Sequence, residues 1–96
     1  MIRRIIIYHL KDDCNKAKVK EGMKTNLEGL VGKVPNLLSM KIHTENLVDG
    51  NSDVMLEATF SDAKAMENYI THPEHVYVAK TFVRPYIDSK HVFNND

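Results

Sequence analysis

The segment 69–78, YITHPEHVYV, holds the side chains of this chain that are best suited to proton transfer. Its two histidines, His72 and His75, stand on either side of a Pro-Glu pair, and Tyr69 precedes them. A neutral imidazole accepts a proton near pH 7, and a neighbouring phenol can donate one or polarise a carbonyl group. The spacing therefore suggests either a metal site or an acid/base pair.

Pro73 distinguishes these two hypotheses. A proline pushes the preceding residue out of the α region and suits the first position of a helix. We therefore expect His72 to lie between two helices and His75 to lie in the first turn of the second helix. Glu74 would be the third ligand, but adjacent side chains diverge on a helix, and a structural zinc site needs four ligands. We predict no metal site and no required cofactor, with Tyr69 and His75 as the candidate catalytic pair.

The same residues also allow a purely structural interpretation. His72 would then join the two helices through side-chain hydrogen bonds, and His75 would be a partly buried core histidine. Tyr69 would be a core aromatic residue whose hydroxyl is bonded to the backbone. The sequence leaves both interpretations open.

The elements that would hold this segment are predicted from hydrophobic periodicity. Residues 2–10 are typical of a strand, and Asp12 and Asp13 supply residues that favour a helix start. Segments 37–45 and 53–60 alternate and predict a hairpin with a tight turn at Asp49-Gly50. In the first of these, one face is expected to carry Leu38, Met40 and Ile42. A helix is predicted between residues 2–10 and segment 37–45, and it ends near Gly32 and Pro35. Its apolar residues recur at steps of three and four: Val19, Met23, Leu27, Leu30, Val31 and Val34.

The second half of the chain predicts two consecutive helices and a last strand. Ser61 is the expected N-cap of the first helix, whose buried side carries Met66, Tyr69 and Ile70. The next helix runs from Pro73 toward Pro85, and an extended segment covers roughly 87–93. The order β-α-β-β-α-β predicts an α+β, ferredoxin-like antiparallel sheet with helices on one face, in a single domain over residues 1–96.

Both faces of the first strand are too apolar to lie in water. Arg3, Ile5, Ile7 and His9 form one face, and Arg4, Ile6, Tyr8 and Leu10 form the other. Packing two open sheet faces together would bury the face that the helices leave free, so we predict a homodimer. Glu57 on the third strand is expected to face this interface and to pair with Arg3 across it.

Composition excludes several classes of protein. Thirteen basic and thirteen acidic residues cancel, so the positive field of a nucleic-acid-binding protein is missing. Cys14 is the only cysteine, which rules out an intramolecular disulfide. The apolar run near the N-terminus is too short for a signal peptide or a membrane helix. We expect an intracellular, cytoplasmic protein that binds neither nucleic acid nor membrane.

An apolar pocket is expected between the helices and the sheet, next to Tyr69 and His75. It would take a small apolar ligand. The predicted binding residues are His72, Met23, Leu27, Met40, Leu56, Ile70 and Phe82.

Four stretches of the chain carry a family resemblance: IRRIIIYHLKDD, VPNL, ATFSDAKAMENYITHPEHV and the closing strand. Together they resemble the stress-responsive A/B barrel domain family over essentially the whole chain. The resemblance implies a dimeric α+β barrel made from two ferredoxin-like sheets. The family includes plant stress proteins, bacterial members without known activity, and the olivetolic acid cyclases, which perform a metal-free aldol condensation.

The resemblance to the cyclases implies roles for individual residues. Tyr69 and His75 match the catalytic tyrosine and histidine, whereas Arg4 and Val54 stand where the cyclases have pocket histidines. Leu27 stands in place of a pocket aromatic residue. The resulting hypothesis is an enzyme that performs acid/base chemistry, of enolisation, aldol or cyclase type, on an apolar carbonyl compound. The alternative is a non-catalytic, ligand-binding or stress-protective homodimer. Monooxygenases on the same barrel are less favoured, because the matched motif differs and the chain contains no tryptophan.

Overall fold

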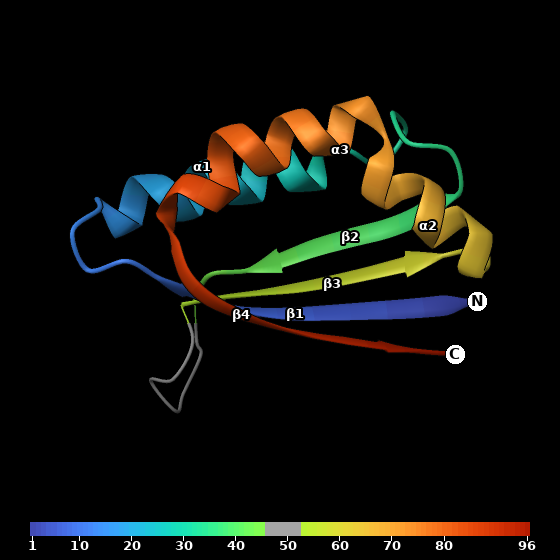
Figure 1. Cartoon of the computed structure of the whole chain (residues 1–96), viewed down its shortest axis with the longest axis horizontal. Helices are drawn as coiled ribbons and strands as arrows, with labels where there is room; N and C mark the ends of the chain where they lie inside the picture. The colour runs from blue at the N-terminus through green and yellow to red at the C-terminus, as the bar shows by residue number, and fades with distance from the viewer. Residues whose placement is uncertain (46–52) are drawn as a thin grey trace.

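A four-stranded antiparallel sheet forms one layer of the molecule, and the helices cover one of its faces (Figure 1). The computed structural model describes residues 1–45 and 53–96. The strand order β2-β3-β1-β4 is that of the ferredoxin-like fold, so the predicted fold class is confirmed. The predicted turn at Asp49-Gly50 lies outside the described residues. The strands are β1 (Ile2–Leu10), β2 (Leu37–His43), β3 (Val54–Phe60) and β4 (Ile87–Asn95).

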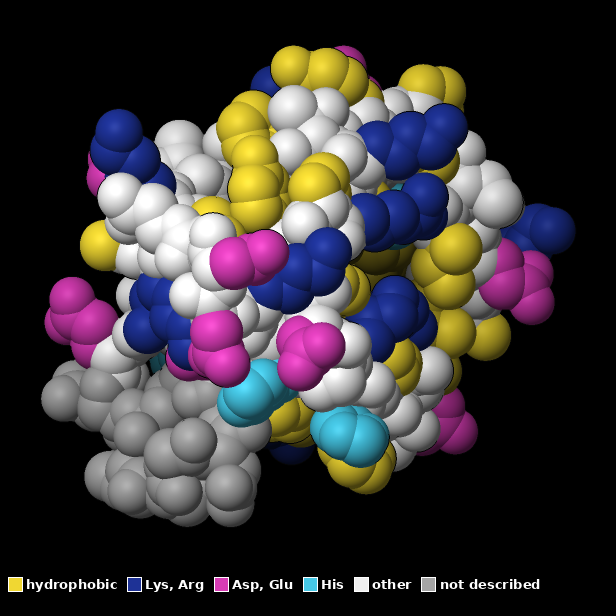
Figure 2. Space-filling view, turned by 60° about the vertical axis from the view of Figure 1, so that its left-hand side comes forward, with side chains coloured by type: hydrophobic (Ala, Val, Ile, Leu, Met, Phe, Trp, Pro, Cys, Tyr) yellow, Lys and Arg dark blue, Asp and Glu magenta, His cyan; other side chains and the backbone are white. Residues whose placement is uncertain are grey.

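The helical layer contains one long helix and one interrupted helical segment. Helix α1 (Lys16–Glu28) follows β1. Helices α2 (Ala63–Thr71) and α3 (Pro73–Val78) follow β3, and α3 continues through the π-helical turn η1 (Ala79–Val83) and the 3-10 turn η2 (Arg84–Tyr86). Charged side chains of both signs cover much of the face seen in Figure 2. Within the described residues, no helix is both long and apolar enough to span a bilayer.

The helix starts differ from the predicted ones. Asn15, rather than Asp12 or Asp13, caps α1, and its side chain accepts a hydrogen bond from the Lys18 amide at 3.2 Å. Asp62, rather than Ser61, caps α2, because its carboxylate accepts the Ala65 amide hydrogen bond at 2.8 Å. In both cases an Asx side chain directly before the helix satisfies a free amide of the first turn.

The predicted end of the first helix was also wrong. Helix α1 ends at Glu28, and the chain then turns through Gly32, whose φ of +93° is unfavourable for other residues. Leu30 and Val34 still reach the core from this turn, whereas Val31 is 42% exposed. Apolar spacing that continues past a helix end can therefore belong to a buried turn.

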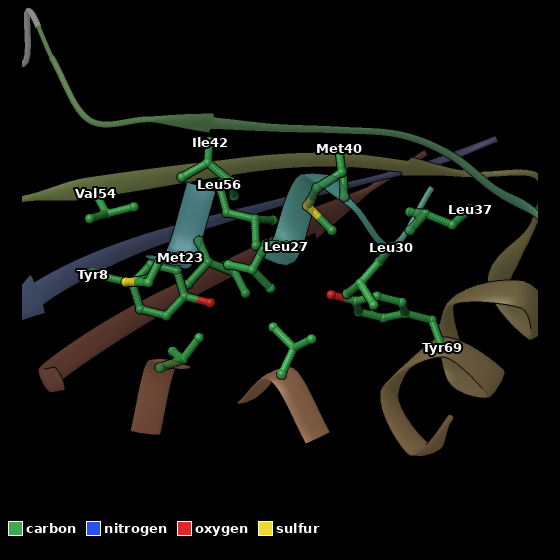
Figure 3. Close-up of a cluster of buried hydrophobic side chains, with 14 of the residues drawn as sticks. Tyr8, Met23, Leu27, Leu30, Leu37, Met40, Ile42, Val54, Leu56 and Tyr69 are labelled. Carbon is green, nitrogen blue, oxygen red and sulfur yellow. The ribbon is translucent and has the colours of Figure 1, made fainter. Parts of the chain in front are cut away.

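The core lies between the sheet and the helical layer (Figure 3). Ile6, Tyr8 and Leu10 of β1 are buried, as the predicted strand faces require. Met23 and Leu27 of α1 pack against them from the helical layer. Strand β2 departs from prediction, because its register shifts between Leu37 and Ser39. This irregularity buries Leu37 and leaves Leu38 53% exposed, so Leu38 does not share the inner face with Met40 and Ile42.

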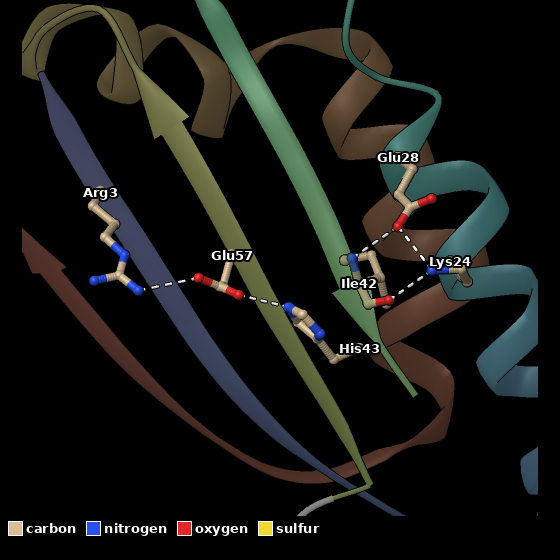
Figure 4. A network of polar contacts seen from close by, with 6 residues as sticks. All are labelled: Arg3, Lys24, Glu28, Ile42, His43 and Glu57. Atoms are coloured by element: carbon tan, nitrogen blue, oxygen red, sulfur yellow. Dashed lines mark hydrogen bonds and ion pairs between the residues drawn. The ribbon is translucent and has the colours of Figure 1, made fainter. Parts of the chain in front are cut away.

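The open face of the sheet combines apolar side chains with a charged network (Figure 4). Ile5 and Ile7 are half-buried in the single chain. Glu57 accepts a hydrogen bond from Arg3 at 3.1 Å and contacts Nε2 of His43 at 2.6 Å. The Arg3 guanidinium, followed by His43, holds the pKa of the Glu57 carboxyl below its usual value. The predicted pairing of Glu57 with Arg3 thus occurs within one chain.

Helix α1 also covers the edge of the sheet at β2. The Glu28 carboxylate accepts a hydrogen bond from the Ile42 amide at 2.9 Å. Lys24 donates to the Ile42 carbonyl at 2.9 Å and to Glu28 at 3.1 Å (Figure 4). These contacts occupy backbone groups that an edge strand would otherwise offer to another strand.

Candidate functional site

The break between α2 and α3 sets the positions of the candidate catalytic residues. His72 is extended, with φ −65° and ψ 135°, and Pro73 occupies the first turn of α3. The His72 amide donates to the Tyr69 carbonyl at 3.1 Å, and Nδ1 of His72 accepts the Glu74 amide hydrogen bond at 3.1 Å. His72 therefore ends α2 and caps α3. This is the role that the structural interpretation of the sequence assigned to it.

Tyr69 is a buried side chain near the end of α2, with 2% of its surface exposed. Its ring lies 5.0 Å from that of Phe60 at an interplanar angle of 58°, a favourable tilted aromatic arrangement. Burial, followed by the nearby Tyr8, raises the pKa of the Tyr69 hydroxyl, and Arg4 opposes this only in part. Tyr69 consequently stays protonated at neutral pH and can donate a hydrogen bond.

His75 packs on the other side of Tyr69. The two ring centroids are 4.2 Å apart, with an interplanar angle of 36°. Nδ1 of His75 lies 3.0 Å from the carbonyl oxygen of Ile70. Because a carbonyl only accepts hydrogen bonds, Nδ1 must carry the proton, and Nε2 of the neutral ring is left with a free lone pair.

The surroundings of His75 keep its ring neutral. Burial lowers the pKa of His75, and the Ile70 carbonyl opposes this by stabilising the protonated ring. Arg4, Arg84 and Lys90 lower the pKa further by charge repulsion. A histidine with a lowered pKa is available as a general base at neutral pH.

A cavity of about 110 Å³ lies beside this pair. Its volume is below the 300–1,000 Å³ typical of sites for drug-sized ligands, so it suits a small molecule. Both Tyr69 and His75 line it. The other lining residues are Arg4, Ile6, Tyr8, Leu27, Ile70, Ala79, Val83, Arg84, Ile87 and Lys90.

Two tyrosine hydroxyls point toward one another in this region (Figure 3). They belong to Tyr8 on β1 and Tyr69 on α2, which both line the cavity. Burial raises the pKa of Tyr8 to about 12, with Arg4 opposing the shift. Among the described residues, neither hydroxyl has a hydrogen bond that shifts its pKa. The structure thus offers two protonated phenols beside one neutral imidazole.

The structure distributes the predicted binding residues over four environments. His72 lies at the break between α2 and α3 and is absent from the cavity lining. Leu27 and Ile70 line the cavity, and Ile70 is 39% exposed instead of buried as predicted. Met23, Met40 and Leu56 are core residues that are absent from the cavity lining. Phe82 lines a separate open hollow beside Gly22 and Tyr86. The pocket is apolar only on one side, because basic and hydroxyl groups form the rest.

None of the lining residues with a basic side chain was predicted as a site residue, and neither was Tyr8; the basic ones are Arg4, Arg84 and Lys90. The alternation of β1 could have found Tyr8 and Arg4, because they share the inner face of the strand with Ile6. Arg84 and Lys90 follow no local pattern, and the fold alone brings them to the cavity.

The metal hypothesis has no geometric support within residues 1–45 and 53–96. No three His, Cys, Asp or Glu side chains there gather as a metal site requires. His72 uses Nδ1 to cap α3, and His75 uses Nδ1 toward Ile70.

Comparison with known proteins identifies both a family and a fold. The model of the stress responsive A/B barrel domain matches residues 2–95. A search of curated proteins finds no match.

Several solved structures share the fold. A dimeric protein of unknown function from Bacteroides fragilis superposes with a TM-score of 0.88 at 23% identity, covering 99% of this chain and 94% of that one. A hydroxynitrile lyase from Passiflora edulis gives 0.80 at 21% identity, with 98% and 90% covered. A candidate antibiotic biosynthesis monooxygenase from Nitrosomonas europaea gives 0.78 at 14% identity, with 100% and 97% covered. At these identities the likeness shows the fold alone.

Proposed function

The chain belongs to the stress-responsive A/B barrel domain family, and on this premise we propose that it catalyses proton transfer on a small carbonyl compound. The observation that carries the proposal is the arrangement of Tyr69 and His75 beside one cavity. One group is a neutral imidazole with a free Nε2, and the other is a phenol that stays protonated.

The proposed step is enolisation. Nε2 of His75 removes a proton from the carbon next to the carbonyl group, and the electron pair of the C–H bond moves to form an enolate. The hydroxyl of Tyr69, with Tyr8 as a second donor, stabilises the enolate oxygen by a hydrogen bond. The His75 imidazolium then returns the proton, or the enolate carbon attacks a second carbonyl group as in an aldol reaction.

The environment of His75 favours the first half of this cycle. The ring starts neutral, because burial and three nearby cations disfavour its protonated form. The same cations would stabilise a negatively charged enolate in the cavity. The contact with the Ile70 carbonyl fixes the tautomer and orients the ring.

Hydrogen–deuterium exchange detects enolisation without knowledge of the product. Butan-2-one and 2-oxobutanoate would be incubated with the protein in D₂O, and loss of the signal next to the carbonyl followed by proton NMR. We expect exchange above the buffer rate, at least about 100-fold slower in His75→Asn. Tyr69→Phe should slow exchange, whereas Tyr77→Phe, at an exposed tyrosine outside the cavity lining, should not. Equal rates with and without protein would overturn the proposal.

A non-catalytic, ligand-binding or stress-protective dimer is the alternative function. It uses the same cavity, and it predicts ligand binding without exchange at any carbon. The dimer itself is supported by the similar structures described as dimeric. We propose that the open face of the sheet forms the interface, because Ile5 and Ile7 remain half-buried there and Phe93 is exposed.

A further inference from the structure

The polar side of the cavity carries positive charge only. Arg4, Arg84 and Lys90 line it, and none of its lining residues in the described part of the chain is Asp or Glu. Figure 2 shows Lys and Arg side chains gathered around a hollow with hydrophobic atoms in it. A cavity with this lining attracts an anion and repels a cation.

Arg4 has unused hydrogen-bonding capacity at this site. One of its terminal nitrogens donates to the side chain of Asn94, at 3.1 Å, on the neighbouring strand. Its Nε is fully buried and, among the described side chains, is the only such polar atom without a partner. Buried N–H groups are normally paired, so the guanidinium of Arg4 keeps donor capacity that the described residues do not use.

The three cations come from separate parts of the fold. Arg4 lies on β1, Arg84 begins η2, and Lys90 lies on β4, which pairs with β1. Arg84 and Lys90 are exposed, whereas Arg4 is half-buried. Arg4 therefore provides the more desolvated contact, where an ion pair is less screened by solvent.

We propose that the cavity selects small carboxylates, with Arg4 as the residue that binds the carboxylate group and Arg84 and Lys90 as supporting charges. A guanidinium offers a fork of donors that matches a carboxylate, and the small cavity leaves room for only a short carbon skeleton. The inference rests on the proposed function for its carbonyl group, since the substrate class becomes a short oxo acid. The carboxylate is held by Arg4 while the carbonyl faces the two phenols.

Butanoate and its neutral analogue butanamide, which have short carbon skeletons, test the charge requirement in a protein-observed NMR titration at constant pH. We expect butanoate to bind at least about tenfold more tightly than butanamide, and its affinity to fall as salt is raised. The preference should disappear in Arg4→Gln and weaken in Lys90→Gln. It should persist in Lys80→Gln, the matched control at an exposed lysine outside the lining. If Arg4→Gln does not fold, Lys90→Gln and the salt series carry the test.

The outcomes separate this inference from the proposed function. Equal affinity for the two probes, or an unchanged preference in both variants, would overturn the carboxylate inference. Exchange of butan-2-one as fast as that of 2-oxobutanoate would also overturn it, while leaving the enolisation proposal standing. Binding of butanoate that depends on Arg4, without exchange of either carbonyl compound, would support the carboxylate site and overturn catalysis.

Discussion

Removing the hydroxyl of Tyr69 separates a catalytic role of this residue from a structural one. If the hydroxyl were bonded to the backbone, Tyr69→Phe would leave a buried partner unsatisfied and lower the free energy of unfolding by about 1–3 kcal/mol. The structure shows a different environment. The pKa of Tyr69 reflects burial and nearby charges, with no hydrogen bond among the described residues, and the side chain lines a cavity.

The expected magnitude follows from these contacts. The ring stays in place against Phe60 and His75, so the packing of Tyr69 is retained in the phenylalanine variant. Removing a hydroxyl that lines the cavity without a protein partner relieves a desolvation cost, which water in the cavity offsets in part. We expect the free energy of unfolding to lie between unchanged and about 1 kcal/mol higher. Tyr69→Ala, which also removes the ring, should lose about 3–5 kcal/mol.

Urea unfolding at one fixed protein concentration measures this difference, because the proposed dimer would make stability depend on concentration. Tyr8→Phe is the matched variant on the facing side of the cavity, and Tyr77→Phe is the exposed control. A gain of about 1 kcal/mol would raise the melting temperature by roughly 4–8 °C in a domain of this size. A loss of more than about 1 kcal/mol in Tyr69→Phe would refute the reasoning and favour a structural hydroxyl.

Two further predictions concern pH and assembly. Because the folded-state pKa of His75 lies below its unfolded value near 6.5, its neutral ring favours folding above that pH, and stability falls as the pH drops below it. Acid unfolding curves of His75→Asn should therefore be flatter than wild type just below pH 6.5, and parallel curves would contradict this. On the open sheet face, Ile5→Glu places a carboxylate opposite Glu57 and should convert the proposed dimer to a monomer in light scattering. Val31→Glu, in an exposed turn, should leave the oligomeric state unchanged. A dimer that persists in Ile5→Glu would contradict an interface on the open face of the sheet.

Alternating hydrophobicity is sufficient to predict the hairpin strands β2 and β3, because burial on one face forces a period of two along each strand. It does not predict the irregularity at Leu38, since Leu37 and Leu38 are both apolar and either could enter the core. Helix starts are uncertain for a similar reason. Ser61 and Asp62 can both cap a helix, and the choice depends on which side chain reaches the Ala65 amide.

The catalytic pair of the candidate site was predicted because its residues are close together in sequence. Tyr69, Pro73 and His75 form one motif, and the proline break is visible without a structure. The charged lining depends on pairing between β1 and β4, which brings together residues more than eighty positions apart, such as Arg4 and Lys90. No local sequence pattern shows that these two residues lie close together, so the predicted pocket did not include the basic residues.

The lining of the cavity lowers the stability of the fold but favours the binding of a ligand. Arg4, Tyr8 and Tyr69 line the cavity, and no hydrogen bond among the described residues satisfies the two hydroxyls or the Nε group of Arg4. An apolar side chain at any of these positions would avoid a desolvation cost. Polar groups that are unsatisfied by the protein itself, yet gathered around one space, are favourable only when something else occupies that space. A short oxo acid supplies what each group lacks: a carboxylate for Arg4 and a carbonyl oxygen for the two phenols.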